Sequence, residues 1–313
     1  MSATGVLVTG ASGLVGSRLV RALAADPRWR VVATDLRDDP AWPAGFAADL
    51  ASADWPTLLR NHDIERVVHL AAVVATRAGH DAGRVREIEV GGTQRLFRGC
   101  TQAGVSQFLV ASSGAAYGYA PGMPEPLSED WPLRPHPDFP YSAHKQEIEA
   151  WLAAQPAPPR TLVLRLCTVL APGRSSPVTA LFERKRVLVL RGVRSPFCFV
   201  HVDDVAAAFQ RALEANAAGT YNLAGAGVLE LREIARRMGA RTLELSPALL
   251  RLALRAGRAL RLTGFTPGQV DFLAYRPVLD AGRLRRELGF ATGFSSEQAF
   301  EAWRVSKGTD PRK

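Results

Sequence analysis

Tyr141 and Lys145 stand four residues apart in the segment Tyr-Ser-Ala-His-Lys. On a helix, this spacing places a phenol and an ammonium group on the same face. A free tyrosine, with a pKa of about 10, is a poor base at neutral pH, but a neighbouring ammonium group stabilises the phenolate. Such a pair can exchange a proton with a substrate hydroxyl while a nicotinamide cofactor exchanges a hydride. The pair therefore predicts redox chemistry at a carbon that carries a hydroxyl group.

A glycine-rich loop follows the first apolar run, with Gly10, Gly13 and Gly16 at intervals of three. Such glycines permit a tight turn and close approach of the backbone to a pyrophosphate, while the following helix offers free N–H groups. Asp35 ends the next apolar run 19 residues after Gly16, where a carboxylate accepts hydrogen bonds from an adenosine ribose. Because Asp35 would repel a 2′-phosphate, we expect NAD. Arg37 keeps NADP open as the less favoured cofactor.

Short apolar runs alternate with helical patterns through the first half of the chain, and they indicate how these side chains are positioned. The runs lie at residues 6–9, 31–34, 67–70, 108–111 and 162–165. Runs that are apolar on both faces are typical of buried parallel strands. The alternation predicts an α/β fold, a Rossmann-type doubly wound parallel sheet with a smaller, mostly C-terminal substrate domain.

The second half suggests how the two domains divide the chain. Residues 197–223 are predicted to add a strand, an alanine-rich helix and another strand to the large sheet. We therefore expect an NAD-binding domain over residues 1–170 plus about 197–225. The substrate-binding domain would comprise residues of about 171–196 and 226–313.

Composition narrows the class of protein. The 313 residues carry a net charge of +9, and residues 228–313 hold 16 Lys and Arg against 9 Asp and Glu. We interpret the excess as a solvated, arginine-rich surface, with an anionic substrate as the second interpretation. The basic residues are not interleaved with aromatic residues as in a nucleic-acid-binding groove, so the sequence does not indicate a nucleic-acid partner. Three cysteines without CxxC spacing fit a reducing compartment, so a cytoplasmic location is expected.

The same sequence argues against a membrane-inserted protein. No apolar stretch reaches the roughly 18 residues of a membrane span, and no secretory signal pattern opens the chain. One amphipathic segment, residues 249–262, places four arginines along one helical face and leucines over much of the rest. We predict a core-packed helix with a solvated basic face. A cap over a bulky apolar or anionic substrate and a membrane-surface helix are the alternatives.

His201, Asp203 and Asp204 are the strongest candidates for metal ligands. An aspartate pair before an alanine-rich helix is more simply a helix cap with acidic residues in its first turn. No complete ligand set with His or Cys spacing accompanies them. We therefore expect no metal.

Taken together, the motifs resemble the extended short-chain dehydrogenase/reductase family, in its NAD-dependent epimerase/dehydratase group. The resemblance covers nearly the whole chain, and it looks most like a bacterial branch named after UDP-glucose 4-epimerase. The residues that carry the resemblance are 9–16, 49–50, 69–72, 112–113, 117–118, 141–145, 199–205 and 221–225.

The resemblance implies a role for each matching residue. Ser113 would orient the substrate oxygen, Tyr141 would act as the acid and base, and Lys145 would hold the nicotinamide ribose. The implied cofactor contacts are Gly10, Ser12, Gly13, Leu14, Val15, Gly16, Asp35, Leu36, Arg37, Asp49, Leu50, Leu70, Ala71, Ala72, Val73, Glu89, Ser112, Tyr141, Lys145 and Cys167. The expected substrate contacts are Ser113, Ala115, Tyr117, Thr168 and Arg194. The family also suggests a homodimer through helices of the cofactor domain.

Three departures from the family pattern concern mainly the substrate. Glu89 replaces an asparagine near the cofactor, Thr168 replaces a substrate-contacting asparagine, and Phe197 replaces an arginine that grips nucleotide phosphates. Glu89 retains the ability to relay a proton, and Arg194, three residues before Phe197, is a candidate replacement for the lost arginine.

Three functions remain open. The leading one is a sugar-nucleotide epimerase like UDP-glucose 4-epimerase. The second is an NAD(P)-dependent alcohol dehydrogenase or ketone reductase with a non-nucleotide substrate. The third is a non-catalytic, cofactor-binding regulator or scaffold, against which the intact Ser113, Tyr141 and Lys145 argue.

Overall fold

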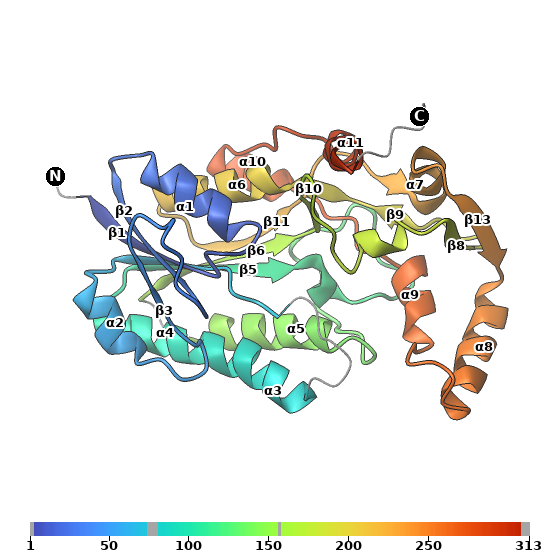
Figure 1. The fold of residues 1–313 in the computed structure, drawn as a ribbon, viewed down its shortest axis with the longest axis horizontal. Helices are drawn as coiled ribbons and strands as arrows, with labels where there is room; N and C mark the ends of the chain where they lie inside the picture. The colour runs from blue at the N-terminus through green and yellow to red at the C-terminus, as the bar shows by residue number, and fades with distance from the viewer. Residues whose placement is uncertain (1–2, 74–80, 156–157, 308–313) are drawn as a thin grey trace.

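A large parallel sheet forms the centre of the molecule. The computed structural model describes residues 3–73, 81–155 and 158–307. Within these ranges, seven strands form one sheet in the order β11-β6-β5-β4-β1-β2-β3, and every neighbouring pair is parallel (Figure 1). The strands are β1 (Thr4–Thr9), β2 (Trp29–Asp35), β3 (Gly45–Ala47), β4 (Arg66–His69), β5 (Gln107–Ser113), β6 (Arg160–Leu166) and β11 (Gly219–Leu223). This is the doubly wound order of a Rossmann-type fold, as the sequence predicted.

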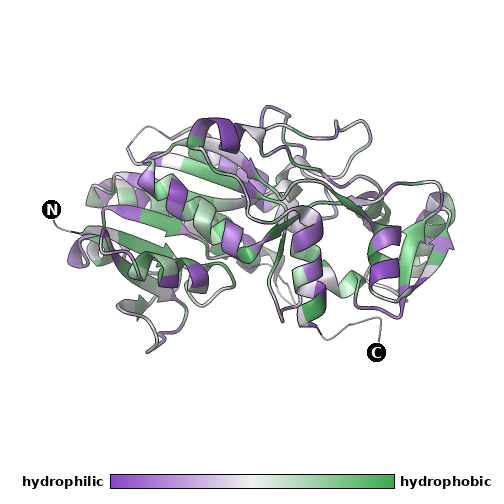
Figure 2. Cartoon of the chain, turned by 90° about the horizontal axis from the view of Figure 1, so that it is seen from above, coloured by the Kyte–Doolittle hydropathy of each residue, from purple (hydrophilic) through white to green (hydrophobic). Residues whose placement is uncertain are grey.

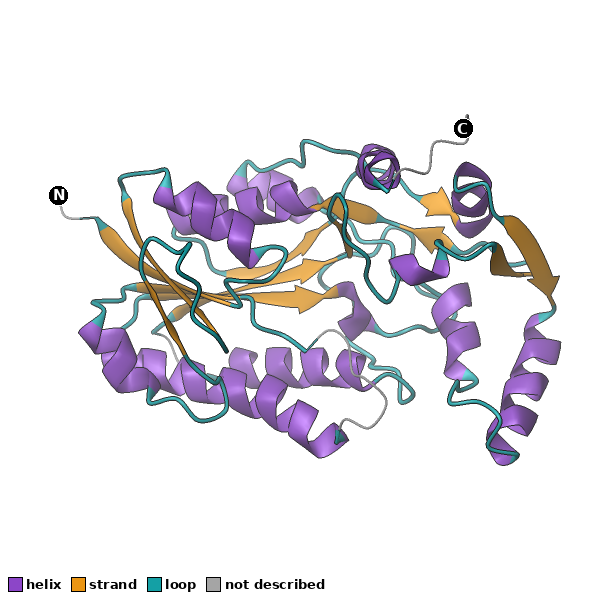
Figure 3. Cartoon of the chain, viewed as in Figure 1, coloured by secondary structure: helices purple, strands orange, loops and turns teal. Residues whose placement is uncertain are grey.

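Helices cover both faces of this sheet (Figure 3). One face carries α1 (Gly16–Ala24), α6 (Val202–Glu214) and α10 (Gly282–Leu288). The other face carries α2 (Trp55–Asn61), α3 (Ala82–Arg86), the π-helical turn η1 (Glu87–Gly91), α4 (Gly92–Ala103) and α5 (Pro140–Ala153). Successive strand residues point to opposite faces, so Val6 and Val8 pack under α1 while Leu7 packs under α4. Hydrophobic residues are concentrated along these strands (Figure 2).

A third hydrophobic core lies beyond the carboxyl ends of the strands. Its rings include Phe182, Phe197, Phe199, Phe300 and Trp303, in mutual contact at centroid distances from 5.0 to 6.5 Å. The surrounding elements are β7 (Thr168–Leu170), η3 (Thr179–Leu181), β8 (Arg186–Leu190), β9 (Pro196–Phe197), β10 (Phe199–His201), β12 (Leu229–Glu230), α7 (Leu231–Arg237), β13 (Arg241–Leu245), α8 (Pro247–Ala259), α9 (Gly268–Ala274) and α11 (Ser296–Ser306). Most of this core comes from the segments expected to form the substrate domain. The domain boundaries themselves stay a prediction.

One predicted strand belongs to a different sheet. The segment at residues 197–201 was expected to join the large sheet, but β10 pairs with β7 and β9 pairs with β12 in separate two-stranded sheets. Phe197 and Phe199 are buried in the third core, whereas Val200 packs in the core beneath α1 and α6. The later strand, β11, does join the large sheet, at its edge beside β6.

The prediction of a core-packed helix for residues 249–262 is wrong in part. Helix α8 covers residues 249–259 of this segment, and none of its residues is fully buried. Leu250 and Leu254 pack against the third core, whereas Leu252 is 64% exposed and Leu262 is 78% exposed. The reason is position, because α8 lies at one end of the molecule beside α9 (Figure 1). In the described part of the chain, no helix combines the length and apolarity needed to cross a membrane.

Candidate functional site

The segments that carry Ser113 and Tyr141 meet at the carboxyl end of β5. Ser113 is the last residue of β5, and its Oγ accepts a hydrogen bond of 3.1 Å from the N–H of Ala115 in the 3₁₀ turn η2 (Gly114–Tyr117). Ser142 Oγ donates to the Ala115 carbonyl at 2.5 Å. Ala115 is thus bonded both to Ser113 and to the first turn of α5. That turn carries Tyr141, so the backbone holds the two predicted catalytic side chains at one edge of the sheet.

Lys145 lies beneath Tyr141 on the same face of α5, as the spacing predicted. Its Nζ is 5.4 Å from the centre of the Tyr141 ring and donates to the Ala111 carbonyl at 3.4 Å. The lysine side chain is buried although it is charged. A positive charge in low-dielectric surroundings acts more strongly on its neighbours than one in water. The arrangement therefore places the Lys145 side chain directly beside the Tyr141 phenol, as the proposed proton exchange requires.

The glycine loop has the shape that a dinucleotide requires. Gly10 has a φ of +68°, in the left-handed region, and a Cβ at this residue would lie 2.7 Å from the Ala71 nitrogen. A Cβ at Gly16 would collide with the Gly10 carbonyl. Asp35 reaches the loop and accepts a hydrogen bond of 3.1 Å from the Ser12 N–H. The backbone is therefore uncovered where a pyrophosphate approaches, with a carboxylate beside it, and these residues fit NAD.

His69 joins the floor of this loop to the helix that carries Glu89. Its Nδ1 is 2.7 Å from Thr9 Oγ1, and its Nε2 is 3.0 Å from Thr93 Oγ1. Thr93 Oγ1 donates its own proton to the Glu89 carbonyl, so Nε2 carries the ring proton and Nδ1 accepts from Thr9. Burial, with a smaller effect of the Lys145 charge, lowers the pKa of His69 to about 3. His69 is therefore a neutral, structural histidine.

Thr9 also holds the segment after β4 against the glycine loop. Its Oγ1 accepts hydrogen bonds from the N–H groups of Leu70 and Ala71, at 3.2 and 3.3 Å. Both residues were expected beneath the cofactor. Ala72 is exposed and Val73 is half-buried at the end of this described segment.

Glu89 lies in the π-helical turn η1 and is buried. Its Oε1 accepts from the Val73 N–H at 2.7 Å, and its Oε2 is 3.5 Å from His144 Nδ1. Burial opposes ionisation, but the interaction with His144, the Lys145 charge and the Val73 N–H together lower the pKa of Glu89 below its ordinary value. The carboxylate that replaces the usual amide is therefore charged, and it holds the segment expected beneath the cofactor.

The remaining expected cofactor residues are distributed along the same edge. Leu14 and Val15 are half-buried before α1, Leu36 and Arg37 are exposed after β2, and Leu50 is buried against Gly92. Asp49 accepts from the Ala51 N–H at 2.8 Å and lies 3.7 Å from Arg84. Cys167 follows β6, and burial raises the pKa of its thiol.

Tyr117, expected to contact substrate, is part of an internal polar network. Its hydroxyl accepts from Arg165 Nη1 at 2.6 Å and donates to Asn222 Oδ1 at 2.9 Å, and Tyr117 is 1% exposed. Arg165 also forms a buried ion pair of 2.7 Å with Glu149, which accepts from Ser112 as well. These contacts occupy the Tyr117 hydroxyl within the protein. A substrate contact for it stays a prediction that this geometry does not favour.

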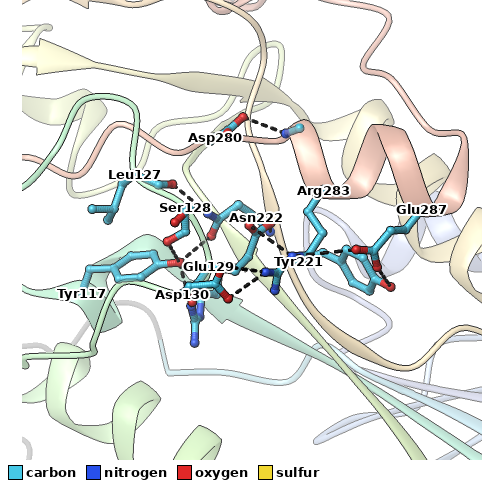
Figure 4. Close-up of polar contacts among 12 residues, drawn as sticks. Tyr117, Leu127, Ser128, Glu129, Asp130, Tyr221, Asn222, Asp280, Arg283 and Glu287 are labelled. Carbon is cyan, nitrogen blue, oxygen red and sulfur yellow. Dashed lines mark hydrogen bonds and ion pairs between the residues drawn. The ribbon is translucent and has the colours of Figure 1, made fainter.

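The network continues from β11 into the loop after η2 (Figure 4). Glu129 Oε1 accepts from the Asn222 N–H at 2.9 Å, and Asn222 Nδ2 donates to the Leu127 carbonyl at 3.0 Å. Arg283, on α10, donates to Asp130 at 2.7 Å. The sequence carries one signal for this network, the charged Arg165 within an apolar strand.

The two other expected substrate residues differ in their surroundings. Arg194 has a side chain that is 60% exposed, and it pairs with Glu230 at 2.9 Å and with Glu125 at 3.4 Å. Thr168 Oγ1 accepts a hydrogen bond of 3.1 Å from Nη2 of Arg276, a residue that the sequence did not identify. A single arginine between Tyr275 and Pro277 carries no motif that would have singled it out.

His201, Asp203 and Asp204, which were considered as metal ligands, contact other parts of the protein. His201 caps α6 and accepts from the Asp203 N–H at 3.4 Å, while Asp203 pairs with Arg18 at 2.7 Å. Asp204 accepts from the N–H groups of Gly293 and Phe294. Across the described ranges, no group of three His, Cys, Asp or Glu side chains is placed to hold a metal ion.

Comparisons with known proteins agree with this geometry. Residues 6–224 match the family described as the NAD dependent epimerase/dehydratase family. The chain is 34% identical over 233 residues to a UDP-glucose 4-epimerase of Mycolicibacterium smegmatis, covering 66% of this chain and 72% of that one. It is 29% identical to a dTDP-glucose 4,6-dehydratase of Streptomyces griseus, with 92% and 89% covered.

A solved structure extends the similarity to three dimensions. MoeE5, in complex with UDP-glucuronic acid and NAD, superimposes with a TM-score of 0.74 at 27% identity, covering 97% of this chain and 99% of that chain.

Proposed function

Because the chain belongs to the NAD dependent epimerase/dehydratase family, we propose that it is a sugar-nucleotide epimerase that acts by hydride transfer at a carbinol carbon. Family membership confirms the resemblance to extended short-chain dehydrogenases/reductases, the Rossmann-type fold, an enzymatic role and NAD as the cofactor. The proposal names the reaction and the substrate class.

One observation carries the proposal, the joint placement of Ser113, Tyr141 and Lys145 at the carboxyl end of β5. Ligands bind at this edge in open α/β sheets. The glycine loop and Asp35 follow neighbouring strands, β1 and β2, at the same edge. A substrate between these groups would place one hydroxyl against both the phenol and the cofactor site.

The chain's own groups then divide the proton chemistry. Ser113 Oγ accepts from Ala115, which leaves its O–H free to donate to a substrate oxygen. Tyr141 accepts the proton of the reacting hydroxyl, assisted by the Lys145 charge. When bound, NAD accepts a hydride from the carbinol carbon and can return it. In an epimerase Tyr141 returns the same proton in the second half of the reaction, so no proton is consumed.

The similar proteins support a nucleotide sugar as substrate. The names of the Mycolicibacterium smegmatis relative and of the MoeE5 complexes refer to UDP-glucose or UDP-glucuronic acid. The 4-epimerase activity of the relative is the specific reaction that we propose for this chain. A homodimer through helices of the cofactor domain remains part of the proposal.

One observation favours the second candidate, an alcohol dehydrogenase or ketone reductase with a non-nucleotide substrate. Arg194, expected to replace the missing phosphate-binding arginine, is balanced by two carboxylates on the surface. A diphosphate needs preorganised donors that are not already neutralised.

The two candidates differ in net turnover of the cofactor. Purified protein is incubated with UDP-glucose and, separately, with UDP-galactose, and the sugar nucleotides are separated by chromatography. Interconversion without accumulation of reduced cofactor supports the epimerase. Steady production or consumption of reduced cofactor, with alcohols or ketones as substrates, would replace it with the dehydrogenase or reductase. Mass spectrometry of the purified protein adds an independent test, because an epimerase that recycles its cofactor is expected to retain NAD.

A further inference from the structure

Helix α8 and the turn that follows it carry most of the large apolar side chains on the described surface of this protein. Eight large hydrophobic side chains of the described residues are exposed, and five of them lie between residues 249 and 265. These five are Leu249, Leu252, Leu260, Leu262 and Phe265, with exposed fractions from 56% to 78%. Single exposed leucines are ordinary, whereas a cluster of them marks a surface that contacts something else.

The exposed apolar residues of α8 share one face of the helix. Leu249, Leu252 and Ala256 follow one another at intervals of three and four residues, and all three are exposed. Leu250 and Leu254, on the opposite side of the helix, pack against the third core. The inner face of α8 therefore attaches the helix to the protein, and its outer face is open to solvent at one end of the molecule (Figure 1).

The turn after α8 continues this apolar surface. The N–H groups of Leu260 and Leu262 donate to the carbonyls of Ala256 and Gly257, at 3.0 and 2.8 Å. Arg261, between the two leucines, has a φ of +55°, in the left-handed region that commonly ends a helix. The chain therefore folds back onto the last turn of α8, and both leucines lie at the tip of the helix.

The same segment is basic and has no acidic residue. Four arginines and no Asp or Glu lie between Glu244 and Asp271. Arg251 pairs with Asp271 at 2.6 Å. The other three are Arg255, Arg258 and Arg261. All three are exposed, and none forms an ion pair within the part of the chain that the structure describes. The exposed leucines are thus accompanied by three positive charges that the described residues do not balance.

Exposed leucines beside unbalanced arginines are complementary to the surface of an anionic membrane. Leucine and phenylalanine enter the boundary between headgroups and acyl chains, while the long arginine side chains reach the lipid phosphates. A second copy of α8 would bring the arginines against like charges. Nucleic acid would pair with the arginines but leave the leucines in water. A lipid surface satisfies both kinds of side chain.

We propose that α8 and its following turn bind this protein to the surface of an anionic lipid membrane. The helix lies in the plane of the headgroups and does not cross the bilayer. Figure 1 shows α8 and α2 at opposite ends of the long axis, so the contact leaves the large sheet away from the membrane. The inference does not depend on the proposed reaction, because no proposed catalytic residue takes part in the contact.

The first experiment locates the contact in the unmodified protein. The protein is mixed with vesicles of equal parts phosphatidylglycerol and phosphatidylcholine, or of phosphatidylcholine alone, and vesicle pelleting measures binding. Backbone hydrogen exchange is followed in the same mixtures. We expect binding to the anionic vesicles only, weakened by added salt, with slower exchange of residues 247–265 and unchanged exchange of α11. No binding by the wild type, or unchanged exchange over residues 247–265, would overturn the proposal.

Matched arginine variants separate this face from the general positive charge of the protein. The first variant is Arg255→Gln/Arg258→Gln/Arg261→Gln. It should bind anionic vesicles at least about tenfold more weakly, since each arginine near such a surface contributes several-fold. The control is Arg21→Gln/Arg285→Gln/Arg286→Gln. It removes three exposed arginines of α1 and α10 that likewise have no ion pair among the described residues, and it should bind nearly as well as the wild type. Equal weakening in both would show attraction to the whole basic protein and contradict the proposal.

A leucine variant keeps every charge and tests the apolar contact. Leu249→Ser/Leu252→Ser should leave the melting temperature of the lipid-free protein unchanged, because both side chains are exposed. Its binding to anionic vesicles should fall by at least about tenfold. Val305→Ser on α11, where the valine is 65% exposed, is the control and should bind like the wild type. Undiminished binding of the leucine variant would mean that charge alone attracts the protein, and the proposed insertion of α8 would be wrong.

Two other occupants of this face would give different results. Sedimentation of the lipid-free protein at several concentrations tests a second copy, because association that Leu249→Ser/Leu252→Ser abolishes would assign the face to self-association. Slower exchange of residues 247–265 with polyglutamate, but not with anionic vesicles, would identify an acidic protein segment as the partner. Either result would overturn the membrane proposal.

Discussion

The two ends of the molecule treat polar and charged side chains differently. Around the large sheet, Arg165 and Glu149 neutralise each other, and His69 is bonded at both ring nitrogens. Beside the third core, Arg276 Nη1 has no hydrogen-bond partner among the described residues, and the adjacent end of the molecule exposes Leu252 and Leu262. These charged and polar groups of the sheet region have their partners within the chain. The second region leaves one arginine nitrogen unpaired among the described residues and several leucine side chains in contact with solvent.

This difference suggests that the proposed catalytic residues and the residues that would select the substrate lie in different parts of the molecule. The proposed catalytic groups are positioned by backbone contacts within the sheet and α5, which form whether or not a substrate is present. Preorganisation of this kind stabilises a transition state without rearrangement. On the side expected to bind substrate, Arg276 Nη1 has no hydrogen-bond partner among the described residues, and leucines of α8 lie exposed.

The largest expected effect is that of Tyr141→Phe. If the chemistry resides entirely in the sheet region, loss of this hydroxyl lowers the rate by roughly 10² to 10⁴-fold, the usual contribution of a general acid or base. NAD binding and the melting temperature should stay close to wild type. Tyr221→Phe is the matched control, because the Tyr221 hydroxyl contacts Glu287 on α10. Steady-state rates check the prediction, and an unchanged rate for Tyr141→Phe would refute the mechanism.

The next effect concerns folding of the same region. Glu149→Leu leaves Arg165 as an unpaired buried charge and should lower the free energy of unfolding by about 3–5 kcal/mol. The double variant Glu149→Leu/Arg165→Met removes both charges and should recover most of that loss. Urea unfolding measures both variants. Equal losses in the single and double variants would show that hydrogen bonds to Tyr117 and Ser112, rather than charge balance, hold this region together.

The sequence predicted the sheet region better than the substrate region because its signals are local. The glycine spacing, Asp35, and the four-residue interval from Tyr141 to Lys145 each lie within one βα unit or one helix turn. The contact between Arg276 and Thr168 joins residues 108 positions apart and has no local signature. The apolar segment at Phe197 indicated a strand but not which sheet it joins, since both environments are buried.

The same reason explains why the expectation for α8 was wrong in part and why the geometry does not favour a substrate contact for Tyr117. The amphipathic pattern of α8 identified its apolar face but not whether anything in the chain covers that face. Similarly, the motif around Tyr117 predicted the position of the side chain, whereas Arg165 and Asn222, which engage its hydroxyl, lie on other strands. Spacing along the chain determines which way a side chain points. Spacing does not determine which residues of other elements contact that side chain.

A smaller effect is expected from the buried, neutral His69 of the sheet region, which makes stability depend on pH. His69 has a pKa of about 3 in the folded protein against 6.5 ordinarily. Between these values the unfolded chain binds a proton that the folded protein does not, so stability falls as the pH is lowered through this window. The slope attributable to His69 is at most about 1.4 kcal/mol per pH unit, and the contribution is intact above pH 6.5. His69→Gln should show a flatter profile in urea unfolding across the window. A profile parallel to that of the wild type would mean that His69 charges in the folded protein.

The smallest expected effect lies at the opposite end of the molecule. Leu252, on α8, is 64% exposed, whereas Leu19, on α1, is completely buried. The same substitution at the two residues therefore measures the contrast directly. Leu19→Ala should lower the free energy of unfolding by about 2–5 kcal/mol, the usual result for a buried leucine. Leu252→Ala should change it by less than about 0.5 kcal/mol, because little apolar surface leaves water when this side chain folds. Urea unfolding at several protein concentrations compares them. A loss of unfolding free energy in Leu252→Ala that depends on protein concentration would show that another molecule covers α8 in solution. The exposed leucines of α8 would then be buried by association of the protein.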